Sequence, residues 1–278
     1  MKRTRVLEYV HRDSIVHRLS GCSKLLCFLI MSTAAMFTFD VRLLIFIMAL
    51  SLVVMYVSKT KFKEISIALI YILIFLLINF ALTFVFSPQF GPEIYGTKHV
   101  LFAFSERYTL TLEQVFYQIS KLIKYLSLVP FGLLLFLTTD PSEFASSLNR
   151  IGVPYRICTA LSLTLRYFPD VQRDFTTIHQ AGQARGFNNG KGAKLVDRFK
   201  GVAGILVPLL FSTLDRIEVV SNAMELRSYG KKDKRTWYNA RPFTRNDYIA
   251  LALCTIVLLL VLYVRFFINH SIYYNPFI

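Results

Sequence analysis

Residues 65–86 read ISIALIYILIFLLINFALTFVF, and this stretch decides the class of fold. Its 22 residues carry no charge, and at 1.5 Å per residue they form a helix of about 33 Å. The hydrocarbon core of a bilayer is about 30 Å thick, so the stretch predicts a transmembrane helix. A helix–helix hydrogen bond explains its one amide, Asn79, more simply than a place on a transport path.

A longer apolar block lies upstream, at residues 25–57. A single helix of this length would measure about 50 Å, which is too long for one straight span. Two short spans, 25–39 and 41–57, fit better, with a tight turn near Asp40–Arg42. Each span is short unless flanking residues such as Ser20–Lys24 join it, and neither Pro nor Gly marks the turn.

Two further spans are expected, at 119–139 and 248–268, which brings the total to about five. The segment between the third and fourth spans, 87–110, has two prolines and two glycines and predicts a loop. With 54% hydrophobic and 18% charged residues, the chain is neither an ordinary soluble enzyme nor a disordered protein. The sequence therefore predicts an all-α polytopic membrane protein.

The fourth span is expected to begin well before its apolar part. Thr111 and Gln114 resemble a capping box that opens the helix. Lys121 and Lys124 follow near its start, three residues apart. Two roles are open for them, because lysines there either snorkel to the membrane interface or face a protein partner.

Residues 140–247 have a different composition, with 17 Lys and Arg against 10 Asp and Glu, yet they remain rich in aliphatic residues. This pattern predicts amphipathic helices rather than disorder. Asp140-Pro141-Ser142-Glu143 has the cap, proline and acid that open a helix, which should stop near Gly152. Two long helices are expected to follow, at 154–184 and 193–229, each kinked at an internal proline.

The distribution of charge orients these segments. With five spans, the basic segments 1–24, 58–64 and 140–247, with net charges of +4, +2 and +7, share one side of the membrane. The segment 87–118, with a net charge of −1, lies on the other side. Basic segments stay in the cytoplasm, so the amino terminus is expected inside and the carboxyl terminus outside. The expected organisation is a cytoplasmic segment 1–24, transmembrane helices 1–4 in 25–139, a cytoplasmic domain 140–247, and a last transmembrane helix with an outer tail in 248–278.

No catalytic, metal or cofactor site is predicted from the residues. Gly186 to Gly192 resembles a phosphate loop, but the spacing to Lys191 is short by one residue and no Ser or Thr follows that lysine. The five histidines show no metal-ligand spacing, and the four cysteines form no CxxC pair. The net charge of +15 has its explanation in the positive-inside bias, so nucleic acid is not an expected partner.

The two long helices of 140–247 are expected to end alike. The first closes with Ala184-Arg185-Gly186 and the second with Leu226-Arg227-Ser228, followed by Gly230. Taken singly, each arginine is explained by the helix dipole, and each glycine by a helix cap. Two such ends favour a second explanation, because a guanidinium on a helix tip is a rigid fork for a partner's carboxylate.

At these residues the chain resembles the transmembrane T-components of energy-coupling factor transporters, of the EcfT, CbiQ and BioN type. The resemblance also covers the N-terminal Asp13-Ser14-Ile15-Val16-His17-Arg18-Leu19 with Lys24, and Ala223-Met224-Glu225-Leu226-Arg227-Ser228-Tyr229. Leu226 and Ser228 depart from the small-Arg-Gly pattern that Ala184, Arg185 and Gly186 keep.

The resemblance implies a non-catalytic scaffold in the bacterial plasma membrane, part of an ATP-driven importer of vitamins or other micronutrients. Long coupling helices would dock by Arg185 and Arg227, with their neighbours, into two cytoplasmic ATPase subunits. The apolar faces of 154–182 and 195–214 would hold a membrane-embedded, substrate-binding S-component. The identity of the substrate would then belong to the partner.

Two other functions remain as alternatives. A substrate-binding S-component is a compact membrane bundle, and the 108 residues of 140–247 argue against it. A membrane-embedded enzyme would need a metal or acid–base constellation, and the sequence shows none.

Overall fold

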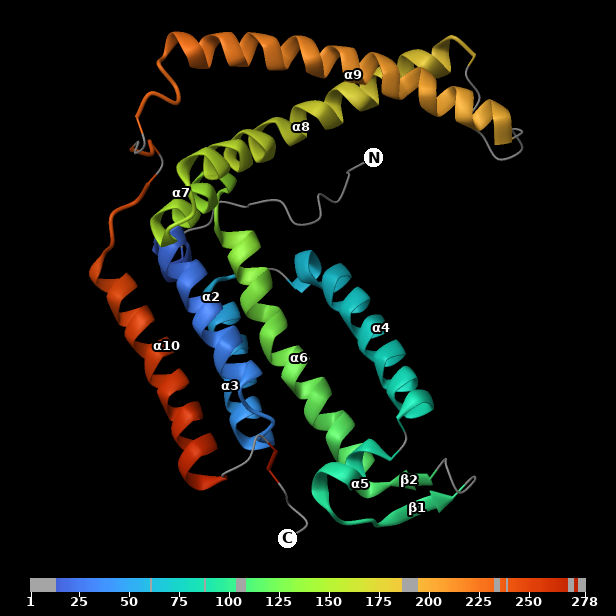
Figure 1. The fold of residues 1–278 in the computed structure, drawn as a ribbon, viewed down its shortest axis with the longest axis vertical. Helices are drawn as coiled ribbons and strands as arrows, with labels where there is room; N and C mark the ends of the chain where they lie inside the picture. Colours follow the sequence, from blue (N-terminus) through green and yellow to red (C-terminus); the bar gives the residue numbers. More distant parts are fainter. Residues whose placement is uncertain are drawn as a thin grey trace. The chain divides into compact units, whose positions relative to one another are not determined.

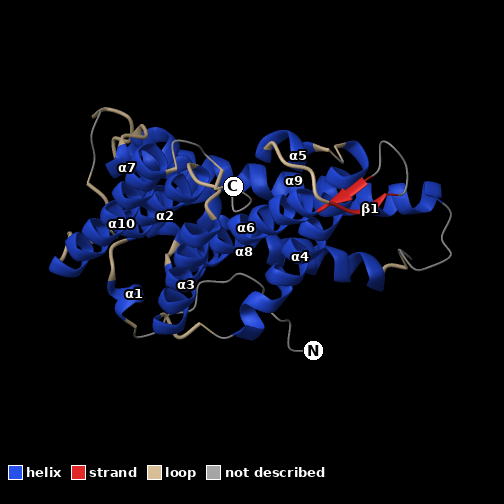
Figure 2. Ribbon diagram, turned by 90° about the horizontal axis from the view of Figure 1, so that it is seen from below, coloured by secondary structure: helices blue, strands red, loops and turns tan. Residues whose placement is uncertain are grey.

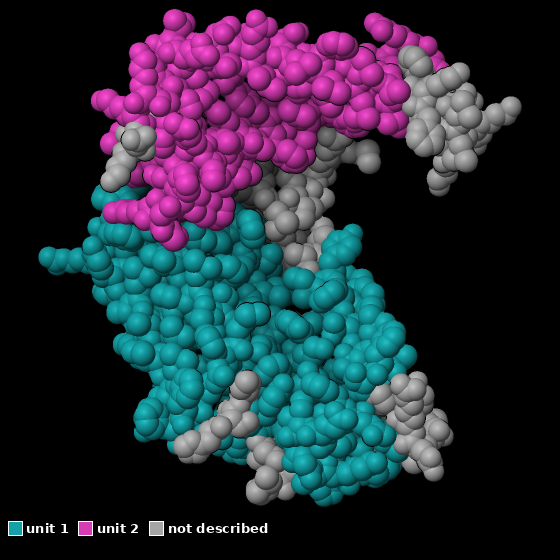
Figure 3. Space-filling view, viewed as in Figure 1, with its two compact units in different colours: residues 1–140, 241–278 teal, residues 141–240 magenta. Residues whose placement is uncertain are grey.

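In a computed structural model, the described residues are 14–60, 62–87, 89–103, 109–186, 195–232, 236–238, 240–269 and 273–274. Contacts between Cα atoms divide the chain into two compact units (Figure 3). The first unit is residues 1–140 with 241–278, and the second is residues 141–240. Among the described residues the regular structure is helical apart from one pair of short strands, which confirms the expected fold class (Figure 2).

The first unit contains the apolar helices (Figure 1). Its elements are α1 Ile15–Arg18, α2 Gly21–Met36, α3 Val41–Val57, α4 Phe62–Phe86, α5 Phe90–Tyr95, β1 Val100–Ala103, β2 Thr109–Thr111, α6 Leu112–Thr138, α10 Arg245–Tyr263 and the π-helix η1 Val264–Ile268. Within the described residues, three stretches are long and apolar enough to cross a membrane: Leu69–Phe86, Leu112–Thr138 and Arg245–Ile268. Shorter apolar helices, α2 and α3, account for the other two expected spans.

The α2–α3 hairpin forms as the length of the apolar block predicted. Ser20 caps α2 by accepting a hydrogen bond from the Ser23 backbone N–H, so residues 21–24 do join the first helix. Asp40 caps α3 by accepting from the Arg42 backbone N–H at 3.0 Å. An aspartate N-cap therefore starts α3 and makes the turn without Pro or Gly.

The buried core of the first unit lies where α2, α3, α6 and α10 pack together. Its fully or almost fully buried residues are Met31, Ala34, Ala35, Leu44, Ile47 and Val261. Alanines at this position let neighbouring backbones approach closely, as is common between membrane helices. The apolar side chains of α4, by contrast, are mostly exposed, which is the surface that lipid or a membrane partner covers.

The segment expected to be a loop at 87–110 has more structure than predicted. It contains the short helix α5 and the strand β1, which pairs antiparallel with β2. The Gln114 side chain accepts from the Gly91 backbone N–H at 2.7 Å and donates to the Ser87 carbonyl. Gln114 therefore holds α5 against α6 and does not complete the expected capping box, of which only the Thr111 half forms.

A buried carboxylate joins the amino-terminal ends of α2 and α10. Asp247 accepts from the backbone N–H and the hydroxyl of Thr244 at 2.7 Å each, from the Ser20 backbone N–H at 2.8 Å, and from the Ser23 hydroxyl. A negative charge is favourable there because both helix dipoles present their positive ends. α10 consequently begins at Arg245, three residues before the expected span.

In the second unit the described residues form three helices, α7 Pro141–Ile151, α8 Tyr155–Ala184 and α9 Leu195–Leu226. Pro169 and Pro208 lie inside α8 and α9 without ending them. The expected loop at 187–192 lies outside the described residues. α9 ends at Leu226, three residues before the expected end at Tyr229, and this shift changes how its terminal arginine is placed.

Candidate functional site: two arginine-tipped helices

Arg185 is the residue that directly follows the last residue of α8. Its backbone N–H donates to the carbonyls of Ala181 and Gly182, at 3.2 and 3.1 Å. The next backbone N–H, that of Gly186, donates to the Gln183 carbonyl at 3.0 Å. Gly186 has a φ of +84°, a left-handed conformation that favours glycine and turns the chain away from the helix.

Arg227 occupies the same position at the end of α9. The Ser228 N–H donates to the Glu225 carbonyl at 2.8 Å, and the Tyr229 N–H donates to the Met224 carbonyl at 2.9 Å. These two bonds form a Schellman motif, whose left-handed residue is Ser228, with a φ of +55°. Both arginines directly follow the last residue of their helix, as 154–184 predicted for Arg185, whereas the expected helix 193–229 had included Arg227.

The two helix ends therefore share one backbone geometry although their sequences differ. The left-handed residue is Gly186 in one and Ser228 in the other, and each follows an arginine. All six predicted site residues are exposed: Ala184, Arg185, Gly186, Leu226, Arg227 and Ser228. Leu226 keeps 88% of its surface accessible to water, and such exposure of a leucine is unfavourable.

The helices that carry these tips cross antiparallel and are joined by an ion pair (Figure 1). The Arg216 guanidinium of α9 donates through Nη2 to the Asp174 carboxylate of α8 at 2.7 Å. The same guanidinium lies 5.9 Å from the centre of the Tyr167 ring. Each member of the ion pair is 30% exposed, so the contact is partly protected from water.

The end of α9 is anchored near the start of α8. The Tyr155 and Tyr229 rings meet edge to face with their centres 5.8 Å apart. Further along, the Trp237 indole N–H donates to the Asn149 side chain at 3.0 Å. Arg227 therefore lies close to the base of α8, whereas Arg185 ends the same helix at its far end. The two guanidiniums lie at opposite ends of the crossed helices.

The faces of α8 and α9 that were expected to hold a membrane partner are exposed and apolar. On α8 they include Ile157, Phe168 and Phe175, each more than 40% exposed. On α9 the exposed residues are Leu206, Val207, Leu210, Phe211 and Leu214. Exposed apolar surface of this extent is typical of an interaction site.

Several residues of the N-terminal sequence motif hold the first unit together. The Ser14 hydroxyl hydrogen-bonds His17 Nδ1 at 2.7 Å, and the Arg241 guanidinium donates to the His17 carbonyl at 3.2 Å. Lys24 is buried, and its ammonium donates to the carbonyl of Thr138, the last residue of α6, at 2.7 Å. A cation there is favourable because the helix dipole ends in negative carbonyls. These contacts indicate a structural role for the motif.

Neither role proposed for Lys124 is correct, because the residue is buried within the first unit. Its ammonium donates to the Met36 carbonyl at 3.0 Å and lies 3.6 Å from the centre of the Phe39 ring. Lys121 donates to the Thr83 hydroxyl at 3.2 Å. Both cations tie neighbouring helices to α6. Among the described residues, no group of three His, Cys, Asp or Glu side chains could hold a metal ion.

The apolar spans define the class of the protein, a polytopic membrane protein. The sequence matches the CbiQ family, described as cobalt transport protein, over residues 12–238. The chain belongs to this family.

Curated relatives support the same class over nearly the whole chain. Their name is energy-coupling factor transporter transmembrane protein EcfT. The protein of Streptococcus equi subsp. equi is 29% identical over 90% of this chain and 92% of its own length. Those of Clostridium kluyveri and Thermotoga maritima are 28% and 27% identical, over 91% and 96% of this chain and 93% and 96% of their own lengths. The chain is thus a membrane component of the energy-coupling factor type.

Proposed function

We propose that this chain is the energy-coupling subunit of an ATP-driven importer of vitamins or other micronutrients. Two cytoplasmic ATPase subunits dock on the tips of α8 and α9, one at Arg185 and one at Arg227. ATP-driven movement of these subunits moves the helices, and the helices move a membrane-embedded S-component that binds the substrate. The observation that carries the proposal is the pair of matched, exposed tips.

The chemistry of the tips suits docking better than helix capping alone. A capping cation needs only positive charge, and it contributes about 0.3–1 kcal/mol at an exposed helix end. A guanidinium also offers a planar fork that binds a carboxylate through two parallel hydrogen bonds. Among the described residues, none forms an ion pair or hydrogen bond with the Arg185 guanidinium, so its donors are available to a partner.

The left-handed residues support the same proposal. At Gly186 a Cβ atom would meet none of the described part of the chain within 4 Å, so this part leaves the backbone open at the tip. A partner's surface can therefore approach the helix end closely beside the arginine. At the tip of α9, the side chains of Ser228 and the exposed Leu226 lie beside Arg227. We therefore expect the ATPase-binding surface at this tip to differ in shape from the surface at Arg185.

The proposed orientation places both tips in the cytoplasm, where ATP is available. It rests on the basic segments 1–24, 58–64 and 140–247, which five spans put on one side of the membrane. The proposed domains keep the boundaries expected from the sequence, with 140–247 as the cytoplasmic coupling domain. The chain supplies no P-loop of its own, so ATP hydrolysis belongs to the ATPase subunits.

The exposed apolar residues of α8 and α9 are the proposed contact surface for the S-component. The tips and these faces lie on the same two helices, and neither Pro169 nor Pro208 ends its helix, so movement at a tip is transmitted along a continuous helix. The test is to replace Arg185 and Arg227 singly and together, and to measure ATPase copurification and substrate uptake. Loss of both in the double variant supports the proposal.

A further inference from the structure

The second unit, residues 141–240, is connected to the first at two points of the chain. The chain leaves the first unit at the end of α6, where two residues separate Thr138 from the start of α7. It re-enters the first unit at Arg241, four residues before α10 begins. Residues 14–24, which contain α1 and the start of α2, form hydrogen bonds at both points.

The exit point is held by a buried cation. The Lys24 ammonium of α2 donates to the carbonyl of Thr138 at 2.7 Å. Because Thr138 is the last residue of α6, this bond ties the end of α6 to the start of α2. Both residues are buried, so water competes little for the contact, and a hydrogen bond is stronger in such surroundings than at the surface. The exit point is therefore fixed within the first unit.

The re-entry point is held by two sets of contacts. The Arg241 guanidinium donates to the His17 carbonyl at 3.2 Å. Asp247 accepts from the Ser20 backbone N–H at 2.8 Å and from the Ser23 hydroxyl, and all three residues are buried. The start of α10 is therefore tied to the start of α2, next to the place where Lys24 ties α6.

The connection that returns from α9 to α10 is long, so its anchoring decides what it can transmit. Among the described residues of 227–244, none belongs to a helix or strand. Three residues separate Trp237, which Asn149 holds within the second unit, from Arg241. A displacement of the second unit therefore reaches α10 through a short segment with a hydrogen bond at each end.

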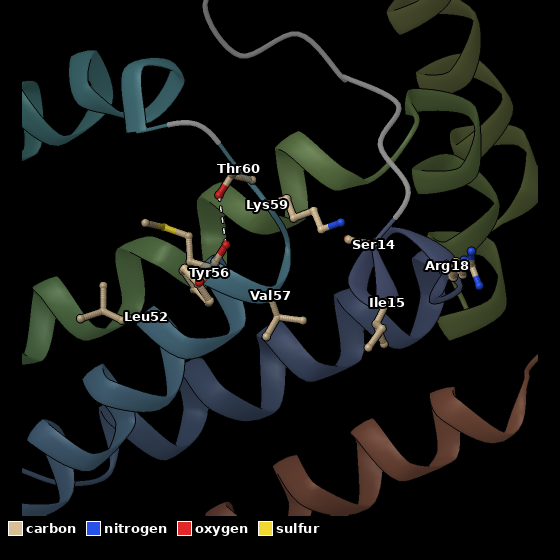
Figure 4. A pocket seen from close by; sticks show the side chains of 9 residues that line it. Ser14, Ile15, Arg18, Leu52, Tyr56, Val57, Lys59 and Thr60 are labelled. Atoms are coloured by element: carbon tan, nitrogen blue, oxygen red, sulfur yellow. Dashed lines mark hydrogen bonds between the residues drawn. The ribbon is translucent and has the colours of Figure 1, made fainter.

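Residues 14–24 are also fixed against α3. Ser14 caps α1 by accepting from the His17 backbone N–H at 3.2 Å. Ile15 of α1 and Val57 at the end of α3 line the same cavity, of about 970 Å³ (Figure 4). The contacts of residues 14–24 thus extend to α2, α3, α6 and α10, which are the four helices that form the buried core.

We propose that residues 14–24 pass the movement of α8 and α9 to the membrane helices, with Lys24 and Arg241 as the positioning residues. This inference rests on the proposed function, which supplies the movement. With both points held, a displacement of the second unit acts on α2 and α10 together through a connected set of hydrogen bonds. With either point released, the chain bends there and absorbs the displacement.

The test uses the full-length chain in complex with its ATPase subunits and S-component, purified in mild detergent. Hydrogen exchange is measured with and without the non-hydrolysable ATP analogue AMP-PNP. One set of peptides covers the tips of α8 and α9, and the other covers α2 and α10. In the unchanged complex we expect the analogue to alter exchange in both sets. The readout needs no transported substrate.

Two variants remove one positioning cation each, Lys24→Met and Arg241→Met. Each should keep the response of the tips within about twofold and reduce the response of α2 and α10 at least about threefold. Arg241→Lys should restore that response, because an ammonium can also donate to the His17 carbonyl. Lys121→Met is the matched control. It removes a lysine that bonds the Thr83 hydroxyl within the same unit, and it should leave both responses unchanged.

An undiminished response of α2 and α10 in both variants overturns this inference and leaves the proposed function intact. An equal loss in Lys121→Met also overturns it, because the effect would then be a general destabilisation. An unchanged complex whose tips do not respond overturns the proposed function, and this inference with it. Arg241 is exposed, so the result for Arg241→Met decides the inference by itself where Lys24→Met does not assemble.

Discussion

Asp174 and Arg216 form an ion pair of 2.7 Å, and each lies eleven residues before the arginine at the tip of its own helix. Asp174 precedes Arg185 in α8, and Arg216 precedes Arg227 in α9. The stretches 174–185 and 216–227 contain no proline, so each is a continuous helical segment about 16 Å long, called an arm below. Because the helices run antiparallel, the ion pair lies between the two tips, and each tip is about 16 Å along its own helix from the ion pair.

The ion pair should therefore set how the two arms cross. We expect Asp174→Ala and Arg216→Ala each to lower thermal stability and uptake, with a coupling energy of about 1 kcal/mol for a pair this exposed. The exchanged pair, Asp174→Arg with Arg216→Asp, should recover part of the loss. A double-mutant cycle by thermal unfolding measures the coupling. An exchanged pair that shows the simple sum of the single losses would contradict this role.

Lysine should replace Arg216 with little loss. Only Nη2 of Arg216 donates to Asp174, and Nη1 is buried without a hydrogen-bond partner among the described residues. A single ammonium can therefore supply the contact, and we expect Arg216→Lys to keep most of the uptake activity. Uptake assays on Arg216→Lys and Arg216→Ala at equal membrane levels test this. Equal loss in the two variants would show that the planar guanidinium itself is needed.

The two left-handed residues predict opposite effects on the helix ends. Gly186→Ala should destabilise the end of α8 by about 1 kcal/mol, because alanine is strained at a φ of +84°. Ser228→Gly should stabilise the end of α9 by about 0.5–1 kcal/mol, because it removes the same strain at +55°. Hydrogen exchange followed in the peptides that cover each tip measures both changes. Faster exchange in Ser228→Gly would contradict the Schellman geometry.

Two native cysteines, Cys27 of α2 and Cys254 of α10, can test whether these helices pack together. Cys27 of α2 and Cys254 of α10 are free cysteines on two helices that pack together, so mild oxidation should join the two helices. With a protease site inserted in 187–192, the two fragments should then stay together on a non-reducing gel. Cys158 is a useful internal contrast, because its burial raises the pKa of the thiol and should leave it unreactive. Fragments that separate after oxidation would contradict the packing.

The sequence was sufficient for the helices but not for the contacts between them. Apolar length alone predicted the α2–α3 hairpin, because a block of 33 residues does not fit one span. Turn residues identified α7 and the start of α8 to within one residue. These features are local, and local patterns determine them.

Contacts between distant residues could not be predicted in the same way. Asp247 was assigned to the cytoplasmic region, yet it caps α10 and bonds Ser20, 227 residues away. Lys124 was expected at an interface or a partner, because nothing in the sequence shows that the carbonyl of Met36 lies beside it. The strands β1 and β2 were missed because the prolines and glycines of 87–110 favoured a loop there.

The arginine tips were identified from sequence, but their shared geometry was not. Leu226 and Ser228 depart from the small-Arg-Gly pattern, and that departure predicted a less close approach of a partner's backbone. The structure instead gives serine the left-handed conformation that Gly186 adopts, so the arginines occupy the same cap position. Serine can adopt this conformation at a modest cost, and residue type alone does not predict it.

The proposed orientation is tested with two exposed lysines. In a chain whose four cysteines are replaced, Lys98→Cys should react with an impermeant maleimide on intact cells, and Lys231→Cys should not. Both should react after the membrane is permeabilised, which controls for access. The reason is the charge distribution, which places 87–118 outside and 140–247 inside. Reversed labelling would overturn the five-span topology.

The docking of two ATPase subunits on Arg185 and Arg227 is the central proposal. Each single alanine variant should weaken assembly and uptake, since removing one partner of a buried charged contact costs about 2–5 kcal/mol. Arg→Lys should rescue only in part, because an ammonium cannot form the two parallel hydrogen bonds. A helix cap alone would instead predict nearly complete rescue by lysine.

The most direct measurement is therefore ATPase copurification, together with substrate uptake, for Arg185→Ala with Arg227→Ala at a membrane level matched to the unchanged chain. Lys231→Ala with Lys232→Ala serves as the control, because it removes two exposed cations near the second tip without touching either arginine. We predict that the arginine double variant loses both the ATPase subunits and uptake while the control keeps them. Retention of both by the arginine double variant would show that these arginines only cap their helices.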